Sequence, residues 1–289
     1  MIRDFEYFAP KTLKEALTLV DKYGDDCKII GGGQSLLILM RQGLVAPQYL
    51  ISIKGLSELS YIKDTKEGLN IGALTTHRAI EKSPVIQKKF SVLADMEQRL
   101  ASIQTRNWGT IGGNLCHGEP AGDPAPVLIA LKATLTTASL KGERSMAVED
   151  FSLDYFETAL EPGELLTEIQ VPAVSPHTGT TYTKFNVIQS DLATVGVAVS
   201  ITLGSSDGIC QDIRIALGAS APTPMRAKKA EEVLRGKKIT DDLLKKAGEV
   251  ASTEAQPISD IAASEEYRRE LVRVLVARVG KEALARAKA

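Results

Sequence analysis

Residues 106–126, RNWGTIGGNLCHGEPAGDPAP, contain five glycines and lead into a short proline-rich run. Glycines at this density allow positive φ angles and let the backbone approach a ligand closely. Asp123 stands directly before Pro124, which is the usual order of a helix N-cap and a proline in the first turn. We therefore expect a loop-rich run that leads into a helix at Asp123, with a buried helical segment over residues 127–133.

A second glycine cluster, Gly31-Gly32-Gly33-Gln34-Ser35, lies upstream between two apolar segments. Residues 27–30 are expected to form a short buried strand and residues 35–40 a buried helical turn. Consecutive backbone N–H groups in such a turn form a concave site for anionic oxygens, and the helix that follows adds partial positive charge. Thr110 and Asn114 offer further donors. Together the two glycine motifs indicate a site for a phosphate-bearing cofactor.

Neither glycine motif fits the common nucleotide-binding patterns. In the first motif, Gln34-Ser35-Leu36 stands where Gly-x-Gly-x-x-Gly needs its third glycine, and the chain has no Gly-Lys-Ser/Thr of a P-loop. Each motif also has an ordinary structural interpretation, because a glycine triplet is typical of a turn and Asp123 is typical of a helix cap. Only the combination of motifs favours a binding site.

The composition argues against several classes of function. A net charge of −1 and an aromatic content of 5% disfavour a nucleic-acid surface, and no apolar run is long enough to span a membrane. The N-terminal segment lacks the apolar region of a signal peptide, and the three cysteines are too widely spaced for a disulfide framework. We expect a cytoplasmic protein with no metal ligands and no catalytic base, whose redox chemistry would need an organic cofactor.

Local signals predict mixed helices and strands in the first 173 residues. Thr12 and Glu15 form a capping box for a helix that stops near Gly24. The other predicted elements are hairpins over residues 59–74 and 134–148, a helix over 92–103, and strands over 49–53 and 165–171.

Residues 172–181, PAVSPHTGTT, are rich in Pro, Ser, Thr and Gly, and we place a domain boundary there. Three long strand-like runs follow, and three helical runs come after them. The strands are predicted at 181–187, 193–203 and 211–217, and the helices at 224–234, 241–252 and 264–284. Strands followed by helices predict an α+β domain, in which a sheet carries helices on one face.

Several motifs resemble those of a known family and occur in the same order. They are KIIGGGQSLL at 28–37, IGALTTH at 71–77, TIGGNL at 110–115, GEPAGD at 118–123, APTPMRA at 221–227, ISD at 258–260 and ASEEYRR at 263–269. Together they resemble the FAD-binding medium subunit of molybdenum hydroxylases, the carbon monoxide dehydrogenase and xanthine dehydrogenase type of enzyme. The resemblance covers nearly the whole chain.

The resemblance implies an α+β fold with a two-lobed FAD-binding domain of the PCMH type over residues 1–173. Its lobes would span about 1–55 and 56–173, and a C-terminal domain with an antiparallel sheet and helices on one face would span 178–289. The residues that would bind FAD are Gly31, Gly32, Gly33, Gln34, Ser35, Thr75, Thr110, Ile111, Gly112, Gly113, Asn114, Asp123, Lys184 and Leu192.

Roles within this set also follow from the resemblance. The two glycine motifs would wrap the pyrophosphate, Asp123 would bond ribose or polyol hydroxyls, and Lys184 and the segment around Asp191 would face the flavin ring. We expect a bulky residue at Gly32 or Gly113 to abolish FAD retention, because its β-carbon would fill the space of the pyrophosphate.

By resemblance the chain is one of three polypeptides that assemble as a dimer of heterotrimers. A large molybdopterin subunit would oxidise the substrate, and a small subunit with two [2Fe-2S] clusters would pass electrons to FAD on this chain. The chain departs from the family pattern in three places: residues 185–190 lack a common arginine, Leu192 replaces an aromatic residue, and Ile38 replaces a common proline.

Two alternatives remain open from the residues alone. One is a self-sufficient flavoenzyme, although the few histidines offer no good base. The other is a scaffold subunit without flavin. The substrate of the complex and the final acceptor, whether NAD, quinone or oxygen, are not indicated by this chain.

Overall fold

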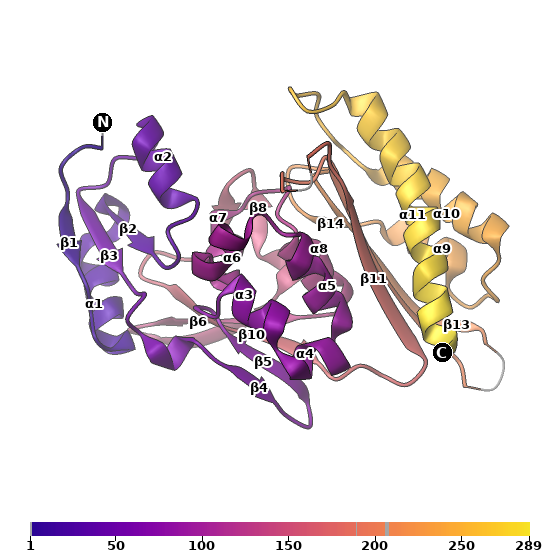
Figure 1. Ribbon diagram of the computed structural model, residues 1–289, viewed down its shortest axis with the longest axis horizontal. Helices are drawn as coiled ribbons and strands as arrows, with labels where there is room; N and C mark the ends of the chain where they lie inside the picture. The colour runs from indigo at the N-terminus through magenta and orange to yellow at the C-terminus, as the bar shows by residue number, and fades with distance from the viewer. Residues whose placement is uncertain (1, 189, 206–207) are drawn as a thin grey trace.

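The computed structural model describes residues 2–188, 190–205 and 208–289. Three sheets follow one another along the longest dimension of the molecule (Figure 1). The N-terminal sheet lies at one end, the sheet that contains β10 lies in the middle, and the sheet under α11 lies at the other end. Within the described residues, no helix is both long and apolar enough to cross a membrane.

The N-terminal sheet is parallel, with the strand order β1-β3-β2. Its elements are β1 (Glu6–Phe8), α1 (Leu13–Tyr23), β2 (Cys27–Ile30), α2 (Leu36–Gln42) and β3 (Tyr49–Ser52). Thr12 caps α1 by accepting a hydrogen bond from the Glu15 N–H, and Gly24 ends the helix, as the capping box predicts. The first glycine motif therefore connects β2 to α2.

The middle sheet is antiparallel, with the order β4-β5-β10-β6-β7. Both hairpins that the sequence predicts in this region are present. Its strands are β4 (Ile62–Asp64), β5 (Gly68–Gly72), β6 (Thr134–Ser139), β7 (Gly142–Ala147) and β10 (Leu165–Pro172). A separate two-stranded sheet consists of β8 (Ser152–Asp154) and β9 (Glu157–Thr158). The helices beside this sheet are α3 (His77–Lys82), α4 (Pro84–Lys89), α5 (Ser91–Arg99), α6 (Ile103–Trp108), α7 (Ile111–His117) and α8 (Pro124–Ala130).

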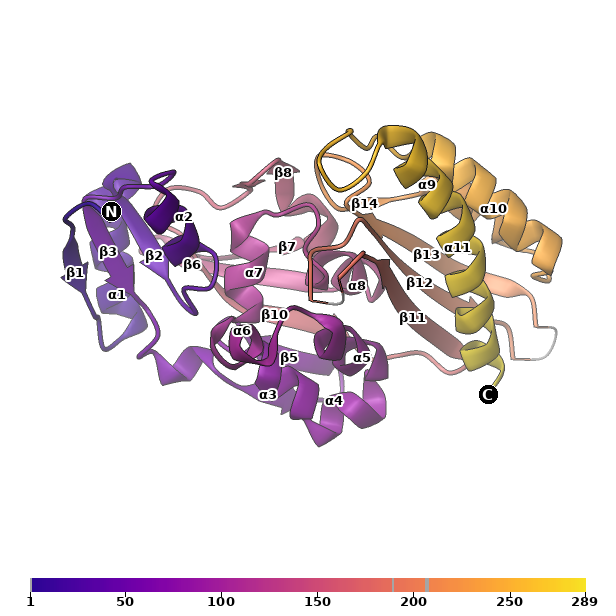
Figure 2. The same ribbon diagram turned by 45° about the horizontal axis from the view of Figure 1, so that its top comes forward.

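The C-terminal sheet is antiparallel and follows chain order, β11-β12-β13-β14. Its strands are β11 (Thr178–Phe185), β12 (Val195–Leu203), β13 (Cys210–Gly218) and β14 (Met225–Arg226), and its helices are α9 (Lys228–Leu234), α10 (Asp241–Glu254) and α11 (Glu265–Lys288). The three helices cover one face (Figure 2). The other face packs on the middle core through Tyr182, Ala198 and Ala216. Burial on both faces explains the long apolar runs in these strands.

The structure corrects four local predictions. The expected loop at 106–126 contains the end of α6 and all of α7. The predicted helix at 92–103 ends at Arg99, because Ala101 has a positive φ of 43°. The predicted helix at 224–234 begins later, at α9, because Met225 and Arg226 pair with β13. The helix after the first glycine motif is not buried: Ile38 is 51% exposed.

Candidate functional site

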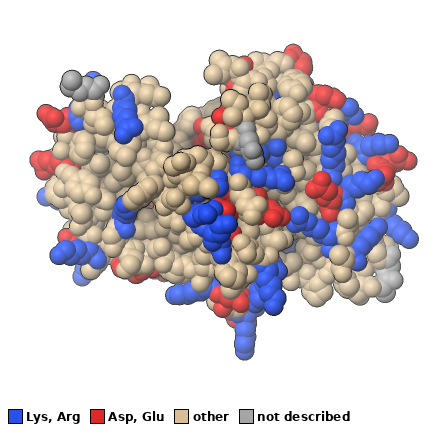
Figure 3. All heavy atoms as spheres, in the orientation of Figure 1, with Lys and Arg blue, Asp and Glu red and all other residues tan. Residues whose placement is uncertain are grey.

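A cavity of about 780 Å³ lies where the N-terminal and middle sheets meet, and the C-terminal part reaches it through Lys184, Asp191 and Leu192. Figure 3 shows the surface hollowed between the N-terminal end and the rest of the molecule. Both glycine motifs line this cavity. Of the predicted site, it contains Gly31, Gly32, Gly33, Gln34, Ser35, Thr110, Gly112, Gly113, Asn114, Asp123, Lys184 and Leu192.

The first glycine motif offers unused hydrogen-bond donors. Among the described residues, no backbone N–H of residues 31–36 has an acceptor, although carbonyl groups of this segment accept from α2. Gly33 has a φ of 74°, which favours glycine and turns the chain into α2. A row of consecutive free N–H groups on a cavity wall forms a nest for phosphate oxygens.

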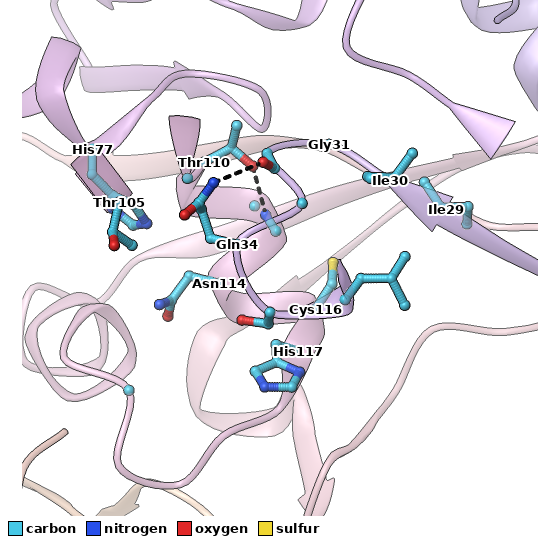
Figure 4. Close-up of a pocket in the computed structure, with 18 of the residues that line it drawn as sticks. Ile29, Ile30, Gly31, Gln34, His77, Thr105, Thr110, Asn114, Cys116 and His117 are labelled. Atoms are coloured by element: carbon cyan, nitrogen blue, oxygen red, sulfur yellow. Dashed lines mark hydrogen bonds between the residues drawn. The ribbon is translucent and has the colours of Figure 1, made fainter. Parts of the chain in front are cut away.

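The second glycine motif uses its donors inside the protein. Thr110 caps α7 by accepting from the Gly113 N–H at 3.1 Å (Figure 4). The N–H groups of Ile111 and Gly112 donate to the carbonyl oxygens of Thr75 and Ala73. A β-carbon at Gly112 would lie 2.6 Å from the Ala73 β-carbon, so this glycine permits close packing of α7 on β5 and its extension.

The two motifs also pack on each other. A β-carbon on Gly32 would lie 2.2 Å from the Trp108 carbonyl oxygen and 2.7 Å from the Gly109 α-carbon. Lys54 lies over the Trp108 ring at 3.7 Å and joins the same two regions. Space for the pyrophosphate was the expected reason for the glycine at position 32, and this reason is wrong. The missing side chain allows the two protein segments to contact each other. At Gly113, a β-carbon would meet only the Thr110 hydroxyl, at 2.8 Å.

Asp123 is buried and fully engaged. One carboxylate oxygen accepts from the Tyr182 hydroxyl at 2.6 Å and the other from Lys184 Nζ at 2.8 Å. Burial raises the pKa of the Asp123 carboxyl, and the Lys184 ammonium partly offsets this. The side chain makes no cap hydrogen bond to α8, which corrects the capping prediction. Lys184 Nζ also donates to the Asp191 carbonyl at 3.0 Å, so this ion pair ties the cavity wall to the C-terminal domain.

Two predicted site residues lie behind the cavity wall. The Thr75 hydroxyl accepts from the Tyr61 N–H at 3.1 Å and donates to the Tyr61 carbonyl at 2.9 Å. Ile111 is fully buried in the middle core. Neither residue is among those that line the cavity, because the Thr75 hydroxyl is bonded to Tyr61 and the Ile111 side chain packs in the core. Leu192 lines the cavity and is 58% exposed. Within residues 185–190, the run that lacks the family's arginine, position 189 lies outside the described residues.

Several lining residues were missed by sequence reasoning. Leu100 and Ala101 line the cavity, and Arg106 donates to both of their carbonyl groups, at 2.7 and 2.9 Å. Arg106 is itself held by Glu81 at 3.0 Å. His77, at the start of α3, also lines the cavity. The sequence signal that could have pointed to this part of the wall was Arg106, the one charged residue in the short helix α6.

The cavity also has an apolar side. Ile30, Leu36, Leu39 and Leu44 line it, which explains why an apolar helix next to the glycines stays partly exposed. Cys116 is another lining residue, and burial raises the pKa of its thiol to about 12, so the thiol stays protonated. A donor-rich nest beside an apolar wall fits a ligand that combines phosphate groups with aromatic rings.

The sequence matches two protein families over almost its whole length. Residues 3–174 match the FAD binding domain in molybdopterin dehydrogenase, and residues 180–283 match the CO dehydrogenase flavoprotein C-terminal domain.

Relatives and solved structures agree with these matches. The glyceraldehyde dehydrogenase medium chain of Sulfolobus acidocaldarius is 35% identical over 279 residues, which cover 96% of this chain and 98% of the relative. The carbon monoxide dehydrogenase medium chain of Hydrogenophaga pseudoflava is 34% identical over 282 residues, 98% of each chain. A solved carbon monoxide dehydrogenase structure from the same organism superposes with a TM-score of 0.96 at 35% identity and covers 99% of both chains. The chain therefore belongs to the family of FAD-binding medium subunits of molybdenum-dependent oxidoreductases.

Proposed function

We propose that this chain holds FAD in the cavity between its glycine motifs and serves as the electron-transfer subunit of a molybdopterin and iron–sulfur complex. It would receive electrons from the iron–sulfur clusters and pass them to a final acceptor. The observation that carries the proposal is the row of free backbone N–H groups over residues 31–36 on the cavity wall.

The residues present fit a flavin dinucleotide. Neutral N–H donors at a glycine turn suit a pyrophosphate, and the apolar side chains of α2 suit an aromatic ring system. Thr110 and Asn114 border the nest, whereas Lys184 and Leu192 reach the cavity from the C-terminal domain. When bound, FAD supplies the redox chemistry; the chain binds it, orients it and surrounds it with fixed charges.

The proposal includes the partners that such a role requires. We infer a large molybdopterin subunit and a small subunit with two [2Fe-2S] clusters, assembled as a dimer of heterotrimers in the cytoplasm. The three cysteines are free thiols, as in a reducing compartment. We also propose that the chain divides into residues 1–173 and 178–289, in keeping with the two family matches.

An absorbance titration of the purified chain with FAD tests the proposal. We expect flavin bands that stay with the protein through gel filtration, and FAD but not FMN after denaturation. In the reconstituted complex, substrate should bleach these bands only when the iron–sulfur subunit is present. Bleaching by substrate of the isolated chain would favour a self-sufficient flavoenzyme, and a chain that never binds flavin would favour a scaffold.

A further inference from the structure

A buried histidine–glutamate pair lies at the cavity wall, and its histidine lines the cavity. His77, at the start of α3, is 2% exposed, and Glu97, on α5, is 0% exposed. His77 Nδ1 lies 3.1 Å from Glu97 Oε1 and 2.9 Å from Oε2. Figure 4 shows His77 beside Thr105 among the residues that line the cavity. Neither member of the pair has a role in the binding site described above.

The second ring nitrogen of His77, Nε2, has no hydrogen-bond partner among the described residues. The adjacent ring carbon, Cδ2, faces Gly109, because a β-carbon on that glycine would lie 3.0 Å from it. The same point is 3.6 Å from Gln34 Cγ. The Nε2–Cδ2 edge of the His77 ring therefore lies where the two glycine motifs meet, and His77 lines the cavity.

The proton count of the pair decides what Nε2 can do. With one proton between Nδ1 and the carboxylate, and one on Nε2, the pair is neutral overall and presents an N–H donor. This holds whether the inner proton sits on His77 or on Glu97. Loss of one proton makes the ring donate from Nδ1 to the carboxylate, so Nε2 becomes an acceptor and a net negative charge is buried.

The surroundings favour the neutral pair. The groups that face it are themselves paired: Arg106 with Glu81, and Asp123 with Lys184 and Tyr182. Cys116 and His117 also line the cavity. Glu97 Oε2 lies 2.9 Å from His77 Nδ1, but the hydrogen bond of that nitrogen is with Oε1, so Oε2 itself accepts none within the described chain. Burial raises the pKa of this carboxyl, which His77 partly offsets. A buried carboxylate with an unsatisfied oxygen keeps a proton nearby.

We propose that His77 is a binding residue for the flavin half of FAD: Nε2–H donates to an acceptor on the isoalloxazine–ribityl part, and Glu97 fixes the tautomer that makes this possible. The inference rests on the proposed function. The flavin half is assigned to this end of the cavity because Asp123, which lies near enough to His77 for their charges to interact, is bonded to Lys184, and Lys184 is expected to face the flavin ring.

Proton-linked binding of FAD follows from this arrangement. FAD binds the protonated pair, so its dissociation constant rises with pH once the free protein loses that proton, by as much as about tenfold per pH unit. ADP-ribose has the pyrophosphate of FAD but lacks the isoalloxazine and ribityl groups. Its affinity should not follow this titration.

The test measures the dissociation constants of FAD and ADP-ribose for the full chain between about pH 5 and pH 9. FAD is followed by flavin fluorescence, and ADP-ribose by quenching of the single tryptophan, Trp108, or by calorimetry. His77→Gln keeps a side-chain N–H donor but lacks the second ring nitrogen that contacts Glu97. Glu97→Gln can donate to Nδ1, so neutral His77 keeps its proton on Nε2. His177→Gln is the matched control, because His177 is not among the residues that line the cavity. Circular dichroism confirms that each variant is folded.

The expected result is a steep alkaline loss of FAD affinity in the wild type and in His177→Gln, and a dependence flatter than twofold in His77→Gln and Glu97→Gln. ADP-ribose binding should be the same within twofold in all four proteins. FAD binding that is independent of pH in the wild type would overturn this inference alone, and so would equal losses for both ligands in His77→Gln. A wild type that binds neither ligand would overturn the proposed function as well.

Discussion

The two glycine motifs are similar in composition but use their backbones in opposite ways. Residues 31–36 leave their N–H groups free on the cavity wall, whereas residues 111–113 donate theirs to Thr75, Ala73 and Thr110. In the first motif the glycines bend the chain between β2 and α2. In the second they lie in the first turn of α7 and let it approach the neighbouring strand.

This difference shows that glycine density alone does not indicate which backbone groups contact a ligand. A glycine can be required because its N–H must be free or because another segment passes close to its α-carbon. Gly32 meets the second condition inside the first motif, since it contacts the Trp108 carbonyl group. The site is thus formed by two segments in contact. The first glycine motif supplies the N–H donors, and the second motif supports the first.

The largest effect is expected for Gly32→Ala, which would break the contact between the motifs. Its β-carbon would lie 2.2 Å from a backbone oxygen, so the first motif must move away from Trp108. We expect FAD affinity to fall about 100-fold, which corresponds to roughly 3 kcal/mol. A flavin titration measures this. Gly55→Ala, on the same lobe with nothing within 4 Å, is the control and should bind FAD normally.

Gly112→Ala should mainly lower the stability of the fold. Alanine normally stabilises a helix, but here its β-carbon would lie 2.6 Å from that of Ala73. We expect the free energy of unfolding to fall by about 2 kcal/mol because of overpacking. Denaturant unfolding followed by circular dichroism measures the change. If Gly112→Ala stabilised the chain, the close packing of α7 would be refuted. Gly113→Ala, which meets only a hydroxyl, should cost less.

Gly33→Ala probes the bend of the first motif. Its φ of 74° is costly for alanine, and the β-carbon would lie 3.1 Å from Ile30 Cδ1. We expect a loss of about 1–2 kcal/mol in unfolding free energy, with weaker FAD binding because the N–H row is rearranged. The relevant comparison is Gly24→Ala, which also has a positive φ but lies far from the cavity. It should lose stability and keep its affinity for FAD.

Thr110→Val should give the smallest effect. It removes the cap of α7 and leaves the Gly113 N–H without its acceptor. The expected cost is about 1 kcal/mol in unfolding free energy. Thr110→Ser keeps the oxygen and should restore most of it. Loss of FAD affinity without loss of stability would mean that Thr110 contacts the ligand and that the two motifs are more alike than the structure indicates.

Much of the architecture could be predicted from local sequence signals. The N-cap at Thr12, the glycine end of α1 and the hairpins at 59–74 and 134–148 all rest on neighbouring residues, and each is present. The Glu15 side chain accepts from the Lys11 N–H and not from the Thr12 N–H of a full capping box. The apolar periodicity also separated the three C-terminal strands from the helices that follow. Local rules failed at Ala101 and at β14, because a positive φ and a strand pairing are imposed by the surrounding structure.

The binding site was predicted less completely, for a related reason. The glycine motifs pointed to the lining glycines and Asn114, and the family resemblance pointed to Lys184. They could not show that Thr75 bonds Tyr61 or that Ile111 lies in the core. They also gave no sign that Glu97 lies beside His77, twenty residues earlier, because that contact depends on how α3 and α5 pack.

The sequence by itself determined the element order, the family and the two glycine motifs, because these depend on local spacing and residue type. Only the tertiary structure decided which N–H groups stay free, why Gly32 must lack a side chain, and that Asp123 before α8 is paired with Lys184 of β11. These properties depend on contacts between residues far apart in the chain. Such contacts are set by the packing of three sheets and their helices, which no short stretch encodes.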